Sequence, residues 1–255
     1  MTRFSANLGF LWKELPLPDA IAAAKSTGFD AVECHWPYEF AAGEVRAALD
    51  EAGLPMLGLN TRRGNAQAGE FGLAALAGRE AEARAAIDEA IAFAAETGTR
   101  NVHVMAGNAA GAEADACFRA NLRHACNRAA AHGIGILIEP MNRHDAPGYF
   151  LGSAAQAEAL IHDLALPNLK LMFDCYHIGR SGADVTSLLM SLLPLIGHIQ
   201  FASVPDRGTP DHGNLDYREV FSALAAAGHD APLGAEYRPV APTAQTLGWM
   251  SKYRS

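Results

Sequence analysis

The chain has 255 residues, half of them hydrophobic, and a formal net charge of −8. This length is close to the roughly 250 residues of a single (β/α)8 barrel, and the apolar content supplies a sizeable core, which excludes a disordered chain. The acidic balance and the lack of a basic block argue against general binding to nucleic acid. We therefore expect one domain spanning residues 1–255.

The N-terminus and the cysteines indicate where the protein works. The first 14 residues contain only short apolar pieces, broken by Arg3, Asn7 and Lys13, so we expect neither a signal peptide nor a membrane span. The four cysteines have no C-x-x-C spacing and are interpreted as reduced packing residues of a cytoplasmic protein. For Cys34 and Cys175, near predicted strand ends, a role beside a site is the alternative. A homo-oligomer is left open.

The first half of the chain alternates short apolar runs with helical patterns. Strands are predicted at residues 3–8, 29–33, 54–60 and 101–105. Apolar residues at helical spacing predict a helix after each of them, and these helices end at Gly28, Gly53, Gly98 and Gly133. A polar, glycine-rich loop at 61–78 precedes the third helix, and loops of that length are often functional.

The second half repeats the alternation. Strands are predicted at 136–139, 169–174, 197–200 and 232–236. Ser153 and Gln156 fit a capping box that opens the helix after the fifth strand. Later helices are predicted around 185–192, around 220–224 with an end at Gly228, and at 243–250. Eight strand–helix cycles without a linker predict an α/β fold, a TIM barrel. A doubly wound sheet competes, but no G-x-G-x-x-G follows the first strand.

Oxygen-bearing side chains end four successive predicted strands. Active sites of such barrels lie at the carboxyl ends of the strands, so these side chains are expected to converge. Three carboxylates and an amide suit Mg²⁺ or Mn²⁺ better than a metal that prefers thiolates. We therefore predict a divalent metal site on Glu139, Asp174, Gln200 and Glu236.

Other polar residues near these strand ends are candidate substrate contacts. His177 is placed in the loop after Asp174, and Arg207 beyond the seventh strand could hold a substrate carboxylate as a fork. His103 fits a substrate contact or a hydrogen-bonded core residue equally well, and Glu70 in the third loop is a weaker candidate. We expect His198 to point towards the helices, because strand side chains alternate, and not to be a ligand.

Several stretches carry a family resemblance that covers the chain from end to end. They include Phe4-Ser5-Ala6-Asn7-Leu8, residues 68–80, His103-Val104-Met105-Ala106-Gly107, Ile138-Glu139-Pro140-Met141-Asn142, residues 147–151, Phe173-Asp174-Cys175-Tyr176-His177, Gly197-His198-Ile199-Gln200 and residues 234–239. On these motifs the chain resembles the hydroxypyruvate isomerase family of the xylose isomerase-like barrels. The resemblance implies metal ligands at Glu139, Asp174, Gln200 and Glu236, with Glu139 and Glu236 as the proton-transfer pair. Glutamine as the third ligand separates this group from relatives with histidine there.

The expected activity is metal-dependent aldose–ketose isomerisation of a small hydroxy-oxo acid, such as hydroxypyruvate to tartronate semialdehyde, through an enediolate. Two loops differ from the family pattern: Gly213 is followed by Asn214 where relatives usually have glutamate, and residues 60–65 lack a leucine-proline-rich segment. Both would surround substrate, so 2-oxo-tetronate isomerisation and 3-epimerisation of a ketose sugar stay open.

Two other classes compete with an isomerase. A DNA-repair endonuclease on the same barrel would need more histidine ligands and a basic rim, which the acidic balance and Gln200 oppose. A non-catalytic binding barrel would not need two facing glutamates on one metal.

Overall fold

The computed structural model describes residues 1–254, and across them eight parallel strands form a single sheet. The strands follow the order β2-β1-β8-β7-β6-β5-β4-β3. Between the two ends of this order, Val32 and Met56 form a bridge, and the amide of Leu57 donates to the carbonyl of Val32 (2.8 Å). The predicted TIM barrel is therefore confirmed as a nearly closed barrel. Its strands are β1 (Phe4–Asn7), β2 (Ala31–Glu33), β3 (Leu59–Asn60), β4 (Asn101–His103), β5 (Gly135–Ile138), β6 (Leu169–Asp174), β7 (Ile196–Phe201) and β8 (Leu233–Ala235).

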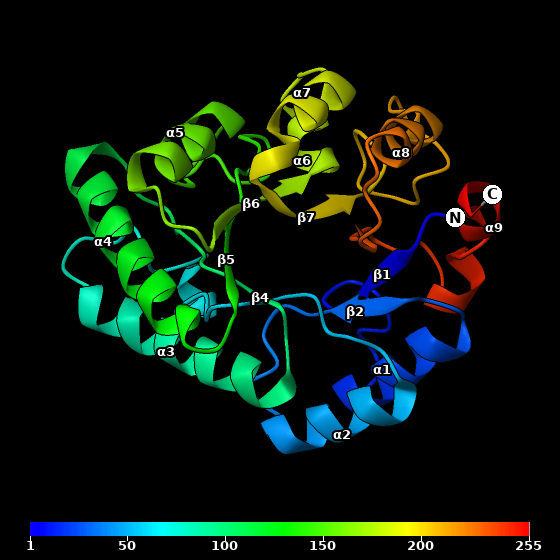
Figure 1. Cartoon of the computed structure of the whole chain (residues 1–255), viewed down its shortest axis with the longest axis horizontal. Coiled ribbons are helices and arrows are strands. Elements are labelled where there is room, and N and C mark those ends of the chain that lie inside the picture. Colours follow the sequence, from blue (N-terminus) through cyan, green and yellow to red (C-terminus); the bar gives the residue numbers. More distant parts are fainter. Residues whose placement is uncertain (255) are drawn as a thin grey trace.

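Helices surround the strands as an outer ring (Figure 1). Their apolar stripes face the barrel, as with Ile87, Ile91 and Ala94 of α3, all of which are buried. Within residues 1–254 no helix is both long and apolar enough to traverse a bilayer. The helices are α1 (Leu17–Ser26), α2 (Ala42–Ala52), α3 (Glu80–Thr97), α4 (Gly111–Ala130), α5 (Ala154–Leu164), α6 (Cys175–Arg180), α7 (Val185–Leu192), α8 (Tyr217–Ala226) and α9 (Trp249–Tyr253), with 3₁₀ turns η1 (Ala66–Ala68), η2 (Leu193–Leu195) and η3 (Thr243–Thr246).

Local signals in the sequence place most of these boundaries. Gly53 and Gly98 follow α2 and α3 in the left-handed conformation, with φ of 63° and 72°. The hydroxyl of Ser153 accepts a hydrogen bond from the amide of Gln156 (3.2 Å), and the Gln156 side chain accepts one from the amide of Gly152 (3.1 Å). The predicted cap of α5 is thus confirmed, with Gln156 reaching one residue further back than in a standard capping box.

Three predicted elements differ in the structure. The third strand, expected over 54–60, is regular only at Leu59–Asn60. The last helix, expected over 243–250, is split into η3 and α9. His177, expected in a loop, lies on α6, which begins directly after β6 because the Asp174 side chain accepts from the amide of Tyr176 (2.8 Å) and caps the helix.

The C-terminal helix closes the outside of the barrel. Trp249 of α9 packs edge-on against Phe4 of β1 and Phe201 of β7, with ring centroids 4.9 and 5.5 Å apart. In Figure 1 the red C-terminal segment accordingly lies beside the blue strand β1. Since this packing covers the flank of the strands, their carboxyl ends stay available for a site. The four cysteines are free and buried, as expected for packing residues.

Candidate active site

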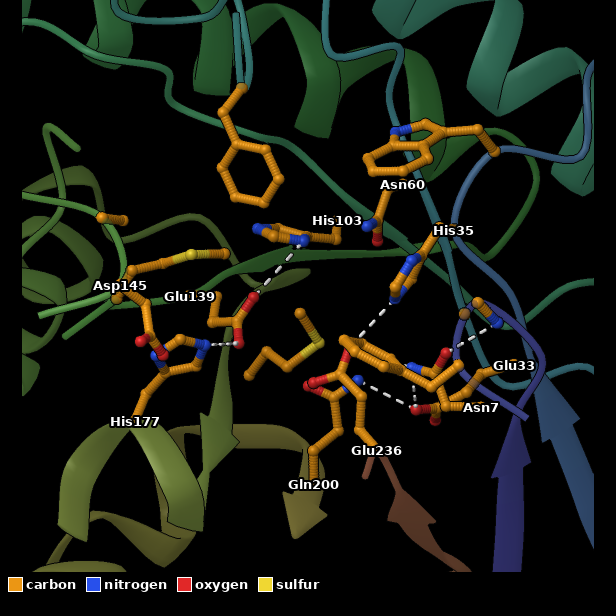
Figure 2. A pocket seen from close by; sticks show the side chains of 18 of the residues that line it. Asn7, Glu33, His35, Asn60, His103, Glu139, Asp145, His177, Gln200 and Glu236 are labelled. Atoms are coloured by element: carbon orange, nitrogen blue, oxygen red, sulfur yellow. Dashed lines mark hydrogen bonds and ion pairs between the residues drawn. The ribbon is translucent and has the colours of Figure 1, made fainter. Parts of the chain in front are cut away.

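A pocket of about 540 Å³ lies at the carboxyl ends of the strands, where sequence analysis placed the candidate residues. Figure 2 shows Glu139, His103 and His177 on one wall, and Glu236, Asn7 and His35 on the other. The lining includes six of the predicted site residues together with residues that were not predicted to act. The polar residues of the lining are Asn7, Lys13, Glu33, His35, Asn60, His103, Asn108, Glu139, Asp145, His177, His198, Gln200, Arg207, Glu236 and Arg238.

Glu139 follows β5 and is almost fully buried, with only 4% of the residue exposed. Its Oε2 lies 3.7 Å from His103 Nδ1, and its Oε1 lies 3.8 Å from His177 Nε2 and has no hydrogen-bond partner. Burial raises the pKa of Glu139 well above its usual value, and the negative charges of Glu236 and Asp174 raise it further. A carboxylate in this position would be stabilised by a cation.

Asp174 ends β6 and is also buried. One oxygen caps α6, and the other, Oδ2, lies 3.6 Å from His177 Nε2 and 3.5 Å from Arg207 Nη2. Burial raises the pKa of Asp174 to about 7, an effect that Arg207 opposes and Glu236 reinforces. As with Glu139, a cation bound nearby would favour the ionised form of this carboxylate.

Gln200 lies next to the last residue of β7, and Glu236 directly follows β8. Gln200 Nε2 donates to Glu33 Oε1 (2.9 Å), while Gln200 Oε1 is buried without a partner. Glu236 Oε2 accepts from Arg207 Nη2 (2.6 Å), and its Oε1 accepts from Asn7 Nδ2 and faces His35 Nε2, both at 3.0 Å. Burial alone would raise the pKa of Glu236, but the charge of Arg207 and the hydrogen bond with His35 outweigh it and lower that pKa. The pKa values of the two glutamates are thus shifted in opposite directions, upward for Glu139 and downward for Glu236.

The donor set fits a divalent cation. Glu139, Asp174 and His177 offer ligand atoms within 4.8 Å of one another. The unpartnered oxygens of Glu139 and Gln200 are orphaned acceptors, the kind of atom that a bound ion satisfies. Carboxylate and amide oxygens suit Mg²⁺ or Mn²⁺. Glu139, Asp174, Gln200 and Glu236 therefore could hold such an ion.

His177 is better placed as a hydrogen-bond donor than as a metal ligand. Asn142 Oδ1 accepts from the amides of His144 (3.0 Å) and Asp145 (2.9 Å), so the Asn142 Nδ2 group faces His177 Nδ1 at 2.7 Å. The backbone N–H of Asn142 also donates to His177 Nδ1 (3.2 Å). Burial lowers the pKa of His177 to about 3, so the ring is neutral. With Nδ1 accepting, its proton resides on Nε2, towards Glu139 and Asp174.

Arg207 and His103 also reach the pocket. Arg207 adopts a left-handed backbone conformation (φ 57°), which is uncommon for a residue with a side chain. Its buried guanidinium lies over the rings of Phe10 (4.8 Å) and Tyr176 (4.9 Å). Neither ring nitrogen of His103 has a hydrogen-bond partner, and burial lowers the pKa of His103 to about 3. Both side chains face the buried carboxylates.

Glu70 is placed elsewhere. Its carboxylate binds Arg79 and accepts from the amide of Asn65 (2.6 Å), an arrangement that holds the third loop together. Glu70 is absent from the pocket lining described above.

The expected orientation of His198, towards the helices, was wrong. Residues 198 and 200 are two apart in β7, so alternation puts them on the same face, and His198 lines the pocket beside Gln200. His198 Nε2 forms a short contact with Glu33 Oε2. Glu33 and His35, at the end of β2, were also not predicted to act. The signal was present, because Glu33 is one of the polar residues that end predicted strands.

Comparisons with known proteins identify the family of the chain. Residues 21–253 match the model of the family described as xylose isomerase-like TIM barrel. The chain is 44% identical to a 2-oxo-tetronate isomerase of Cupriavidus necator over 99% of both chains. It is 34% identical to a hydroxypyruvate isomerase of Escherichia coli over the whole of both chains.

A solved structure overlays on the chain over its full length. The crystal structure titled as an AP endonuclease, family 2, from Brucella melitensis superposes with a TM-score of 0.95 at 36% identity, and all of both chains is covered. An E. coli 3-keto-D-glucoside 4-epimerase superposes with a TM-score of 0.82 at 21% identity over 99% of both chains, a likeness of fold alone. The chain therefore belongs to the xylose isomerase-like TIM-barrel family, within its hydroxypyruvate and 2-oxo-tetronate isomerase branch, and is an enzyme of the isomerase class.

Proposed function

We propose that the enzyme is a metal-dependent aldose–ketose isomerase of short hydroxy-oxo acids, with hydroxypyruvate and tartronate semialdehyde as the first candidate pair. The observation that carries this proposal is the pair of buried glutamates on opposite walls of one pocket (Figure 2). Their pKa values are driven apart, Glu139 upward and Glu236 downward, as expected for groups that exchange roles as proton donor and acceptor.

Glu139, Asp174, Gln200 and Glu236 would hold the divalent cation. When bound, a Mg²⁺ or Mn²⁺ ion supplies Lewis-acid polarisation of the substrate carbonyl and its neighbouring hydroxyl. The protein would supply this ion with oxygen ligands rather than nitrogen ligands. Asp174 is fixed by its cap on α6, and Gln200 by its bond to Glu33.

The proton transfer falls to the two glutamates. One carboxylate removes the carbon-bound proton to give an enediolate, and the other glutamate, protonated, delivers a proton to the adjacent carbon. The proton of the substrate hydroxyl passes to the former carbonyl oxygen, and the two glutamates regain their starting protonation by exchange with solvent. Glu236 is held on both oxygens by Arg207, Asn7 and His35, which keeps it ionised and fixed. Glu139 Oε1 has no partner and is free to accept or deliver a proton.

Substrate oxygens would be bound by the donors that face the carboxylates. His177 presents Nε2–H, and Arg207 presents a guanidinium already oriented by two aromatic rings. His103, whose nitrogens have no other partner, can donate from one of them. These three side chains match the oxygen-rich character of a hydroxy-oxo acid.

A second candidate substrate is 2-oxo-tetronate. The 2-oxo-tetronate isomerase of Cupriavidus necator is 44% identical to this chain, and the hydroxypyruvate isomerase of E. coli is 34% identical. The pocket of about 540 Å³ also leaves room for a four-carbon acid. Asn60, in one of the two loops that depart from the family pattern, lines this pocket. Epimerisation of a ketose at carbon 3 remains a third candidate with the same machinery.

The experiment is a turnover assay on three- to six-carbon oxo-acids and ketoses with added Mg²⁺ or Mn²⁺. We expect the highest kcat/KM for a three- or four-carbon 2-oxo acid. An abasic-site DNA duplex belongs in the panel, because the Brucella structure carries an endonuclease title. Cleavage of that duplex without isomerisation of any acid would contradict the proposal.

A further inference from the structure

Glu33 is a buried carboxylate that the proposed reaction does not use. It ends β2, and its side chain is only 3% exposed. Glu33 Oε1 accepts from Asn7 Nδ2 and Gln200 Nε2, both at 2.9 Å, and Oε2 contacts His198 Nε2. Three side chains from two other strands, Asn7 of β1 and His198 and Gln200 of β7, therefore converge on this one side chain.

The contacts of Asn7 show which end of an amide faces Glu33. Asn7 Oδ1 accepts from the amide of Gly9 (2.9 Å), so its Nδ2 must lie on the opposite side. That nitrogen donates one hydrogen to Glu33 and the other to Glu236 Oε1. Asn7 thus links Glu33 to the glutamate proposed as a proton acceptor.

Gln200 has no such independent constraint on its amide. Its Nε2 has one partner, Glu33 Oε1, and its Oε1 has none. A carboxylate accepts but does not donate, so Glu33 favours the orientation that points nitrogen away from the ligand cluster and oxygen into it. The reversed amide would offer N–H groups to a cation and repel it.

Strand β8, next to β1 in the sheet, keeps space for this carboxylate. A Cβ placed on Gly234 of β8 would lie 2.7 Å from Glu33 Oε1 and 2.9 Å from Gln200 Cγ. The backbone of Gly234 has no positive φ, so close approach, rather than conformational freedom, explains a glycine there. The barrel interior is therefore shaped around the Glu33–Gln200 pair.

We infer that Glu33 is a positioning residue that sets the amide orientation of Gln200, so that the glutamine presents its oxygen to the divalent cation. The inference rests on the proposed metal site. Glu33 touches neither the reacting carbons nor the ion in this account, and it acts through Gln200 and, by way of Asn7, on Glu236.

The test is a Mn²⁺ titration followed by calorimetry, with no substrate present. Glu33→Leu should weaken Mn²⁺ binding about 10- to 100-fold, the usual effect of losing a residue that orients a ligand. Glu33→Gln keeps an acceptor for Gln200, since its own N–H group can face His198, and should bind close to wild type. Circular dichroism checks the fold, and Glu33→Ala replaces the leucine variant if that one does not fold.

The same Glu33 substitution made in a Gln200→Glu protein distinguishes an effect on the orientation of Gln200 from an effect of the Glu33 charge alone. Gln200→Glu puts a carboxylate with two equivalent oxygens at the ligand position, which needs no orientation and is repelled by Glu33. In that background Glu33→Leu should leave Mn²⁺ binding unchanged or tighten it. Weakening of similar size in both backgrounds, or equal loss with Glu33→Gln and Glu33→Leu, would overturn the inference in favour of long-range charge.

The outcomes also separate this inference from the proposed function. If wild-type protein binds no Mn²⁺, the metal site itself fails and the role of Glu33 fails with it. If wild type binds Mn²⁺ and the single Glu33→Leu variant binds it equally well, only the positioning role is lost.

Discussion

Glu139 and Glu236 differ in how their oxygens are held, yet each is expected to be necessary. Glu236→Gln and Glu139→Gln keep an oxygen for the cation but remove a proton acceptor, so each should lower turnover on the order of 10²–10⁴-fold. The double variant should be little worse than either single one, because the pair acts as a unit. The measurement is exchange of the carbon-bound hydrogen of the substrate with D₂O at saturating metal.

The matched control for that pair is Glu70→Gln. Glu70 binds Arg79 and Asn65 in the third loop, so its substitution should leave exchange unchanged. Near wild-type exchange in both Glu139→Gln and Glu236→Gln would rule out the paired-glutamate mechanism, whatever the metal titrations show.

Asn142 decides which nitrogen of His177 carries the proton. Asn142→Leu removes the stronger of two donors to Nδ1, leaving the backbone N–H at 3.2 Å. One hydrogen bond contributes roughly 0.5–1.5 kcal/mol, so kcat/KM should fall up to about 10-fold. The ¹⁵N resonances of the His177 ring should report a wild-type proton on Nε2 and a mixture of tautomers in the variant.

Asn168→Leu is the control for that experiment. Asn168 donates to the carbonyls of Cys126 and Ile134, away from the pocket, so its loss should lower stability and leave the His177 resonances in place. A wild-type His177 proton on Nδ1 would instead favour His177 as a metal ligand.

At the scale of elements, Gly234 of β8 packs so closely against Glu33 that a larger residue does not fit without a shift. Gly234→Ala places a methyl group 2.7 Å from Glu33 Oε1, and relief of such crowding typically costs about 1–3 kcal/mol of stability. We expect weaker Mn²⁺ binding as well, because Glu33 and Gln200 must both move. Gly248→Ala is the matched control, since a Cβ there meets nothing within 4 Å. Equal melting temperatures and Mn²⁺ affinities in the two variants would contradict the close packing described here.

Elements marked by local signals could be predicted from the sequence, and others could not. Helices ending at Gly53 and Gly98, and the Ser153 cap, follow from hydrogen bonds within a few residues. The short length of β3 depends on pairing with β4, and the start of α6 at Asp174 replaces a loop through one side-chain bond. Neither depends on hydrophobic periodicity, which is why pattern reading missed both.

The residues of the candidate site, like the elements of the fold, could be predicted from the sequence only in part. Strand-end position was enough to predict Glu139, Asp174, Gln200 and Glu236 as neighbours, since parallel strands share one edge. The partners that orient them, Glu33 above all, are set by side-chain contacts between strands far apart in the sequence. The misplacement of His198 was of another kind, because correct counting along β7 puts it beside Gln200.

At the scale of the whole molecule, the strand pairing that brings the two ends of the chain together also assembles the site. The contact between Asn7 and Glu236 joins residues 229 positions apart, across the β1–β8 pairing. The buried carboxylates of Glu139, Asp174 and Glu236 are brought close to one another, and burial raises the pKa of Asp174 to about 7 and that of Glu139 well above its usual value. The folded state therefore contains mutual repulsion that the unfolded chain lacks, and Arg207 offsets only part of it.

A cation that binds this cluster should consequently stabilise the fold. Binding to the folded state alone adds about 2.7 kcal/mol at a free ion concentration of 100 Kd. For a chain of this size each kcal/mol raises Tm by roughly 2–4 °C, so Mn²⁺ or Mg²⁺ should raise Tm by roughly 5–10 °C and a chelator should reverse the rise. Gln200→Ala loses one ligand and should show a much smaller rise at the same ion concentration. An equal rise in that variant would place the ion elsewhere, while no rise in wild type would mean that Arg207 and the histidines already satisfy the carboxylates.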